Sequence, residues 1–84
     1  MARVILRASI NSTVGSNTKM AELGKILKNY GLGRIGTGCY EGDFQDERDA
    51  FSAIGEAMDY IAQLPNGYRL DHLWVYVDEV DRPT

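Results

Sequence analysis

Hydrophobic and polar residues alternate over residues 3–11, which predicts a first β-strand. One side carries Val4, Leu6, Ala8 and Ile10, and the other carries Arg3, Ile5, Arg7 and Ser9. A period of two residues is typical of a strand that buries one face. The polar segment that follows predicts a loop, which ends in a helix cap at Ser16, Asn17 or Thr18.

Two later stretches have the three- and four-residue spacing of amphipathic helices. The first covers residues 19–30 and stops before Gly31, a residue type that commonly adopts the left-handed conformation after a helix. The second is expected over residues 47–63, and acidic residues at its start suit a cap and the helix dipole. Between the helices, the glycine-rich residues 33–44 predict either one bent strand or two short ones.

The last third of the chain predicts a turn at residues 65–67 and then a strand that ends near Val80. The element order therefore predicts one α+β domain over residues 1–84, with two helices on one face of a mainly antiparallel sheet. The other face of this sheet has no predicted cover. The side chains expected on it are Arg3, Ile5, Arg7, Trp74 and Tyr76.

Composition narrows the class of protein. The chain has 84 residues and a formal net charge of -3, so any nucleic-acid binding requires a local basic patch. No apolar run is long enough to span a bilayer, and the first residues lack a signal-peptide pattern, so we expect no membrane contact and a cytoplasmic location. Cys39 is the only cysteine, which excludes an internal disulfide and a thiol zinc cluster.

Motifs that carry chemistry are few, and they assign no catalytic residue, metal or cofactor. Gly31, Gly33 and Gly36 have the glycine spacing of a dinucleotide site, but they leave a helix and enter a strand, which favours a capping role. His72 is the only histidine, which excludes a Ser-His-Asp triad within one subunit. The acidic clusters before and inside the second helix and at the end of the last strand are better explained by capping and edge-strand charge than by Mg²⁺ binding.

Arginine and aromatic residues together indicate a contact surface. The candidates are Arg3, Arg7, Arg34, Tyr40, Trp74 and Tyr76. Such a surface can stack bases while guanidinium groups bind phosphates. The same residue types are also enriched at the centres of protein interfaces, and the negative net charge favours a homodimer interface over RNA or DNA.

A resemblance to a known family sharpens this expectation. Residues 23–31 (LGKILKNYG), 34–35 (RI) and 39–42 (CYEG) resemble the helix, turn and strand signature of VapD and CRISPR-associated protein two. Residues 69–77 resemble the closing strand of that group, so the similarity covers about residues 20–80. The resemblance implies a ferredoxin-like fold, a homodimer and a metal-dependent endonuclease that acts on RNA or DNA.

The chain departs from this family at one chemically important place. Family members carry an Asp at the end of strand one, where this sequence offers Ala8 or Ser9. An alanine methyl cannot replace a carboxylate as a Mg²⁺ ligand. We therefore expect a VapD-like homodimer associated with nucleic acid, or with a toxin–antitoxin or CRISPR-type system, but without nuclease activity.

Two alternatives remain open. One is an active Mg²⁺-dependent endoribonuclease that uses another carboxylate, such as Asp43, Asp71 or Asp78. The other is a non-catalytic interaction module or inhibitor with a cognate protein partner. Fold alone does not choose between them.

Overall fold

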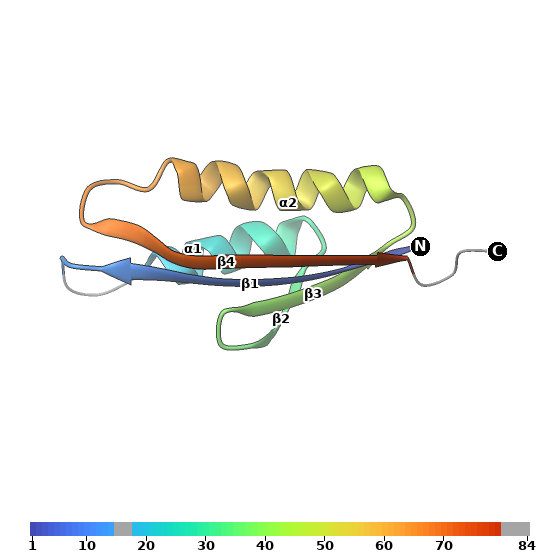
Figure 1. The fold of residues 1–84 in the computed structure, drawn as a ribbon, viewed down its shortest axis with the longest axis horizontal. Helices are drawn as coiled ribbons and strands as arrows, with labels where there is room; N and C mark the ends of the chain where they lie inside the picture. Colours follow the sequence, from blue (N-terminus) through green and yellow to red (C-terminus); the bar gives the residue numbers. More distant parts are fainter. Residues whose placement is uncertain (15–17, 80–84) are drawn as a thin grey trace.

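The fold is a four-stranded antiparallel sheet with two helices on one side, seen in a computed structural model that describes residues 1–14 and 18–79 (Figure 1). The elements are β1 (Ala2–Ser12), α1 (Lys19–Asn29), β2 (Gly33–Gly36), β3 (Cys39–Phe44), α2 (Glu47–Ala62) and β4 (Tyr68–Glu79). The strand order across the sheet is β2-β3-β1-β4. The predicted α+β class is confirmed, and the βαββαβ order is compatible with a ferredoxin-like fold.

β1 is a central strand of this sheet, and its two sides differ as the alternation predicts. It pairs antiparallel with β3 on one side and with β4 on the other, and β1 and β4 run side by side along most of their length (Figure 1). Even-numbered residues of β1 from Ala2 to Ile10 are at most 3% exposed, because they face the helices. A β-bulge between Ser9 and Ile10 shifts the register with β4 near the end of this strand.

The hydrophobic core lies between the helices and this inner face of the sheet. Leu23 and Leu27 of α1 are fully buried against it. α2 contributes small residues, Ala50, Ala53 and Ala57, whose short side chains allow the helix to lie close to the strands. Burial of a leucine side chain stabilises a fold by roughly 1.5–3 kcal/mol, so these contacts hold the helices on this one face.

The helix ends agree in part with the sequence prediction. Gly31 has φ +97° after α1, as predicted for a residue that ends a helix. Thr18 is the N-cap of α1 but makes no side-chain cap bond, and the other two cap candidates lie outside the described residues. At α2, the Asp46 carboxylate accepts a hydrogen bond of 2.9 Å from the backbone N–H of Arg48.

The glycine-rich segment forms two short strands rather than one bent strand. A tight turn at residues 37–38 separates β2 from β3. Gly38 occupies this turn with φ +65°, and a Cβ atom there would lie 2.6 Å from the carbonyl oxygen of Ala8. Only glycine combines this backbone conformation with so close an approach to β1, which explains the break in the strand pattern.

Candidate functional site

The uncovered face of the sheet, here called the open face, carries alternate residues of its three long strands. Its members are Arg3, Ile5, Arg7 and Ser9 of β1, Cys39, Glu41 and Asp43 of β3, and His72, Trp74, Tyr76 and Asp78 of β4. The strand register sets these residues side by side in rows. Four of the six residues predicted for a contact surface therefore share one face, namely Arg3, Arg7, Trp74 and Tyr76.

One end of the open face is acidic. Arg3 lies between Asp43 on β3 and Asp78 on β4, and its Nη2 atom is 3.5 Å from Oδ2 of Asp78. Glu41 is the next open-face residue along β3. Three carboxylates and a single guanidinium share this end of the face, so it repels phosphate groups.

The other end of the open face is aromatic and basic. Arg7 lies between Cys39 and Trp74 in the register. The rings of Trp74 and Tyr76 stack with centroids 6.0 Å apart and planes 9° from parallel, and these residues are 51% and 41% exposed. This end offers a cation and an accessible aromatic surface within the same few residues.

The other two predicted contact residues, Arg34 and Tyr40, are not on the open face. Tyr40 pairs with Leu6, so it points toward the helices, and it is only 4% exposed. Arg34 pairs with Tyr40 across β2 and β3 and shares its side of the sheet. A shift of one residue along a strand moves a side chain to the opposite face. Because the glycine turn at residues 37–38 interrupts the strand pattern, the sequence does not show which residues after the turn face the helices.

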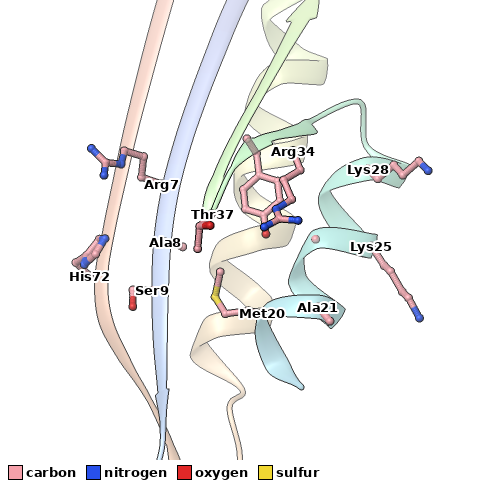
Figure 2. Close-up of a pocket in the computed structure, with 13 residues that line it drawn as sticks. Arg7, Ala8, Ser9, Met20, Ala21, Lys25, Lys28, Arg34, Thr37 and His72 are labelled. Atoms are coloured by element: carbon pink, nitrogen blue, oxygen red, sulfur yellow. The ribbon is translucent and has the colours of Figure 1, made fainter. Parts of the chain in front are cut away.

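Arg34 and Tyr40 instead line a pocket at the edge of the sheet, here called the edge pocket (Figure 2). It has a volume of about 670 Å³ and lies where β1 continues beyond the start of β3, between α1, the turn at residues 37–38 and β1. Arg7, Lys25, Lys28 and Arg34 line it, together with His72. No carboxylate occurs among the described residues that line it.

The basic side chains lie around an apolar floor. Met20, Ala21 and Ala8 form part of this floor together with the Tyr40 ring. Figure 2 shows Lys25 and Lys28 extending outward from α1, while Arg7 and His72 lie beyond β1 on the side away from α1. The edge pocket is therefore an apolar hollow whose rim carries basic residues on both sides, with the charged ends of Lys25, Lys28 and Arg7 directed away from the hollow, a combination that suits an anion with an apolar or planar part.

The shape of the edge pocket depends on Gly24 of α1. A Cβ atom at Gly24 would lie 3.3 Å from the hydroxyl oxygen of Tyr40, so the absence of a side chain leaves room beside the phenol. Burial raises the pKa of Tyr40, and the positive charge of Arg34 opposes this shift. At neutral pH the phenol is therefore protonated and can donate a hydrogen bond at the pocket wall.

Lys25 and Lys28 are the site residues that the sequence prediction missed. Helical spacing alone places both on the polar side of the first helix, where lysines near a helix C-terminus suit the dipole. Their spacing of three residues, followed by Arg34 after a helix-ending glycine, is a signal for a basic cluster. The strand order adds Arg7 to this cluster, and no local pattern shows that arrangement.

The remaining chemical candidates form no catalytic group with one another. Gly31 ends α1, and β2 begins at Gly33, which confirms the capping interpretation of the glycine spacing. His72 is exposed on β4, with Nδ1 3.6 Å from Oδ2 of Asp71. Cys39 is half-buried on the open face.

The carboxylates of the nuclease alternative do not meet in one place. Asp43 and Asp78 lie on either side of Arg3, whereas Asp71 lies beside His72, further along β4. Within residues 1–14 and 18–79, no group of three His, Cys, Asp or Glu side chains is arranged to hold a metal ion. Ala8 is 3% exposed beneath the helices, and Ser9 lies on the open face.

Comparison with family models and curated proteins identifies no relative of this chain. No protein-family model and no curated protein matches the chain. None of the helices in the described part is long and apolar enough to cross a membrane.

Proposed function

We propose that this chain is a VapD-like protein that binds nucleic acid at the edge pocket and does not cleave it. One observation carries the proposal: Arg7, Lys25, Lys28 and Arg34, four of the nine basic residues of an acidic chain, line one pocket, and no described lining residue is acidic. Phosphate groups are the anions that such a cluster binds most strongly when they repeat along a strand.

The size and floor of the edge pocket favour a nucleotide unit over a simple anion. Its volume of about 670 Å³ is within the range of small-molecule sites. Met20, Ala21 and the Tyr40 ring offer apolar contacts to a base or sugar, while the basic side chains at the rim are within reach of phosphates that pass outside the hollow. The open face then contributes the exposed Trp74 ring next to Arg7, at the end of the sheet that the pocket shares.

The proposal of binding without cleavage depends on strand one. Ala8 or Ser9 stands at the position at which the resemblance to VapD requires an Asp; Ala8 lies under the helices with a methyl group, Ser9 has a hydroxyl on the open face, and neither offers a carboxylate. The same resemblance supports a homodimer and a role in a toxin–antitoxin or CRISPR-type system, in which a binding protein without nuclease activity sequesters nucleic acid or opposes an active relative.

Fluorescence anisotropy tests the binding. Labelled single-stranded RNA, single-stranded DNA and duplexes are titrated at low salt with the wild type, with Lys28→Gln/Arg34→Gln, and with a control, Arg48→Gln, whose position on α2 is not among the pocket lining. We expect the wild type and the control to bind alike and the double variant to bind roughly ten-fold more weakly or worse, since it loses two phosphate contacts.

The same oligonucleotides incubated with Mg²⁺ or Mn²⁺ test for cleavage. Intact strands after binding support the proposal. Metal-dependent cleavage that is abolished by Asp43→Asn, Asp71→Asn or Asp78→Asn supports the nuclease alternative instead. Equal binding by the double variant and the wild type contradicts the assignment of the edge pocket.

A further inference from the structure

β4 is an edge strand whose outer side is unpaired among the described strands. It lies at the end of the sheet order and bonds only to β1, although it is 12 residues long. Four of its large apolar side chains are exposed: Leu70 (40%), Trp74 (51%), Tyr76 (41%) and Val77 (38%). A long edge of this kind is a template for another strand unless the protein blocks it.

The strand register shows which backbone groups reach this free edge. The N–H of Ala8 donates to the carbonyl of Gly38 at 2.9 Å, so even-numbered residues of β1 direct their backbone groups toward β3. Odd-numbered residues such as Arg7 therefore bond to β4, at its even-numbered partners such as Trp74. The N–H and C=O groups of Leu73, Val75 and Val77 then point outward, away from β1.

Charged residues that protect an edge lie only at the two ends of this part of β4, at Asp71 and at Asp78 and Glu79. Between His72 and Asp78 there is no proline, no lysine and no bulge, since the only register shift with β1 lies opposite the start of the strand. The side chains of this segment also alternate without interruption. Leu73, Val75 and Val77 occupy the helix side, and Trp74 and Tyr76 the open face.

We propose that two copies of the chain join their β4 strands antiparallel, with Val75 opposite Val75 of the second copy at a two-fold axis. This register places Leu73 opposite Val77 and Trp74 opposite Tyr76, so apolar residues meet apolar residues on both faces. It also places His72 opposite Asp78, a pair of complementary character, and Asp71 opposite Glu79, two carboxylates at the outer ends of the paired segment. Each copy donates the N–H groups of Leu73, Val75 and Val77 to the other.

Neighbouring registers lack this self-complementarity at the central residues 72–78. Only shifts by two residues keep side chains on the same face and backbone groups aligned. A shift that centres the pairing on Trp74 sets Asp71 against Val77 and Leu70 against Asp78. A shift that centres it on Tyr76 sets Trp74 against Asp78 and Leu73 against Glu79. Both place a carboxylate beside apolar side chains, where its desolvation is unfavourable.

The expectation of a homodimer from the sequence did not say which backbone edge joins the two copies, and this pairing assigns the contact to the free edge of β4. It joins the two sheets edge to edge into one continuous sheet and leaves the open face of each copy accessible. The exposed rings of Trp74 and Tyr76 then meet their counterparts at the centre of that larger face. Binding at the edge pocket does not depend on this pairing, so either proposal can fail without the other.

Site-specific disulfide formation tests the register in a Cys39→Ala background. In the proposed dimer the two Val75 positions form a hydrogen-bonded pair with Cα atoms about 5.5 Å apart, which suits a disulfide. Two Leu73 positions lie about 14 Å apart, beyond disulfide reach. On mild oxidation we expect Val75→Cys to give roughly ten-fold more linked dimer than Leu73→Cys, and Leu73→Cys/Val77→Cys to link as well as Val75→Cys.

A second measurement covers the case in which cysteine variants fold poorly. Light scattering of the wild type should give the mass of a dimer, and Val77→Pro should give a monomer with an unchanged circular dichroism spectrum, because the lost N–H faces the free edge. Val77→Ala is the matched control and should remain largely dimeric. A monomeric wild type, a dimer insensitive to Val77→Pro, or equal linking of Leu73→Cys and Val75→Cys overturns the proposal.

Discussion

One substitution, glycine to alanine, should have opposite effects at two places in this fold. At Gly38 the backbone has φ +65°, and an added Cβ atom would lie 2.6 Å from the carbonyl oxygen of Ala8. At Gly55, in the interior of α2, an added Cβ atom would meet nothing within 4 Å. The chemical change is the same, so the difference isolates the local backbone and its surroundings.

The magnitudes follow from these environments. Alanine in the left-handed conformation costs about 1–2 kcal/mol, and the close approach to Ala8 must also be relieved. Relief moves the turn that accepts the 2.9 Å hydrogen bond from the Ala8 N–H, so the total for Gly38→Ala should reach about 2 kcal/mol or more. Gly55→Ala instead gains about 0.5–1 kcal/mol, because alanine loses less backbone entropy in a helix.

Thermal and urea unfolding followed by circular dichroism measures both effects. For a domain of this size, 1 kcal/mol shifts Tm by roughly 4–8 °C. Gly38→Ala should therefore melt at least roughly 8 °C below the wild type, and Gly55→Ala should melt a few degrees above it. Equal stability of Gly38→Ala and the wild type would refute the turn geometry, and a destabilised Gly55→Ala would refute the open space beside α2.

Three further substitutions test separate parts of the structure. Tyr60 donates a 2.7 Å hydrogen bond to Glu22, which contributes to a lowered pKa of Glu22. The hydrogen bond stabilises the ionised Glu22 of the folded protein, so its contribution is complete above the ordinary pKa of 4.5 and is lost as pH falls through the lowered pKa. Tyr60→Phe should therefore reduce the free energy of unfolding at pH 7. Urea unfolding should show that the difference from the wild type becomes smaller in acid. Leu6→Ala removes a fully buried side chain and should cost about 2–5 kcal/mol in urea unfolding, whereas no cost would contradict its place in the core. Gly24→Leu fills the edge pocket beside Tyr40 without a change in charge, so it should weaken oligonucleotide binding in anisotropy titrations. Unchanged binding would show that the ligand does not enter the pocket.

The helices and the central strand were predictable from the sequence because their signals are local. The alternation in β1 separates buried from accessible side chains, and the predicted helices differ from α1 and α2 by one residue at their ends. Gly31 marked the end of α1 correctly, since a left-handed residue after a helix is favoured as glycine.

The edge pocket was not predictable because it depends on the order of the strands in the sheet and on which face each strand residue occupies. Arg7 and Lys25 come from elements that the sequence separates and the sheet brings together. Tyr40 was grouped with the exposed aromatics, yet its pairing with Leu6 directs it inward. Such non-local pairing is decided by the packing of the whole sheet rather than by any short pattern.

The salt dependence of oligonucleotide binding tests the central claim most directly. Each phosphate contact contributes about -0.7 to the slope of log K against log salt for a single strand. We expect Lys28→Gln/Arg34→Gln to reduce the magnitude of that slope by about 1.4 relative to the wild type, with Arg48→Gln unchanged. A slope that is the same for all three proteins, or no binding by the wild type at low salt, would contradict a phosphate-binding role for the edge pocket.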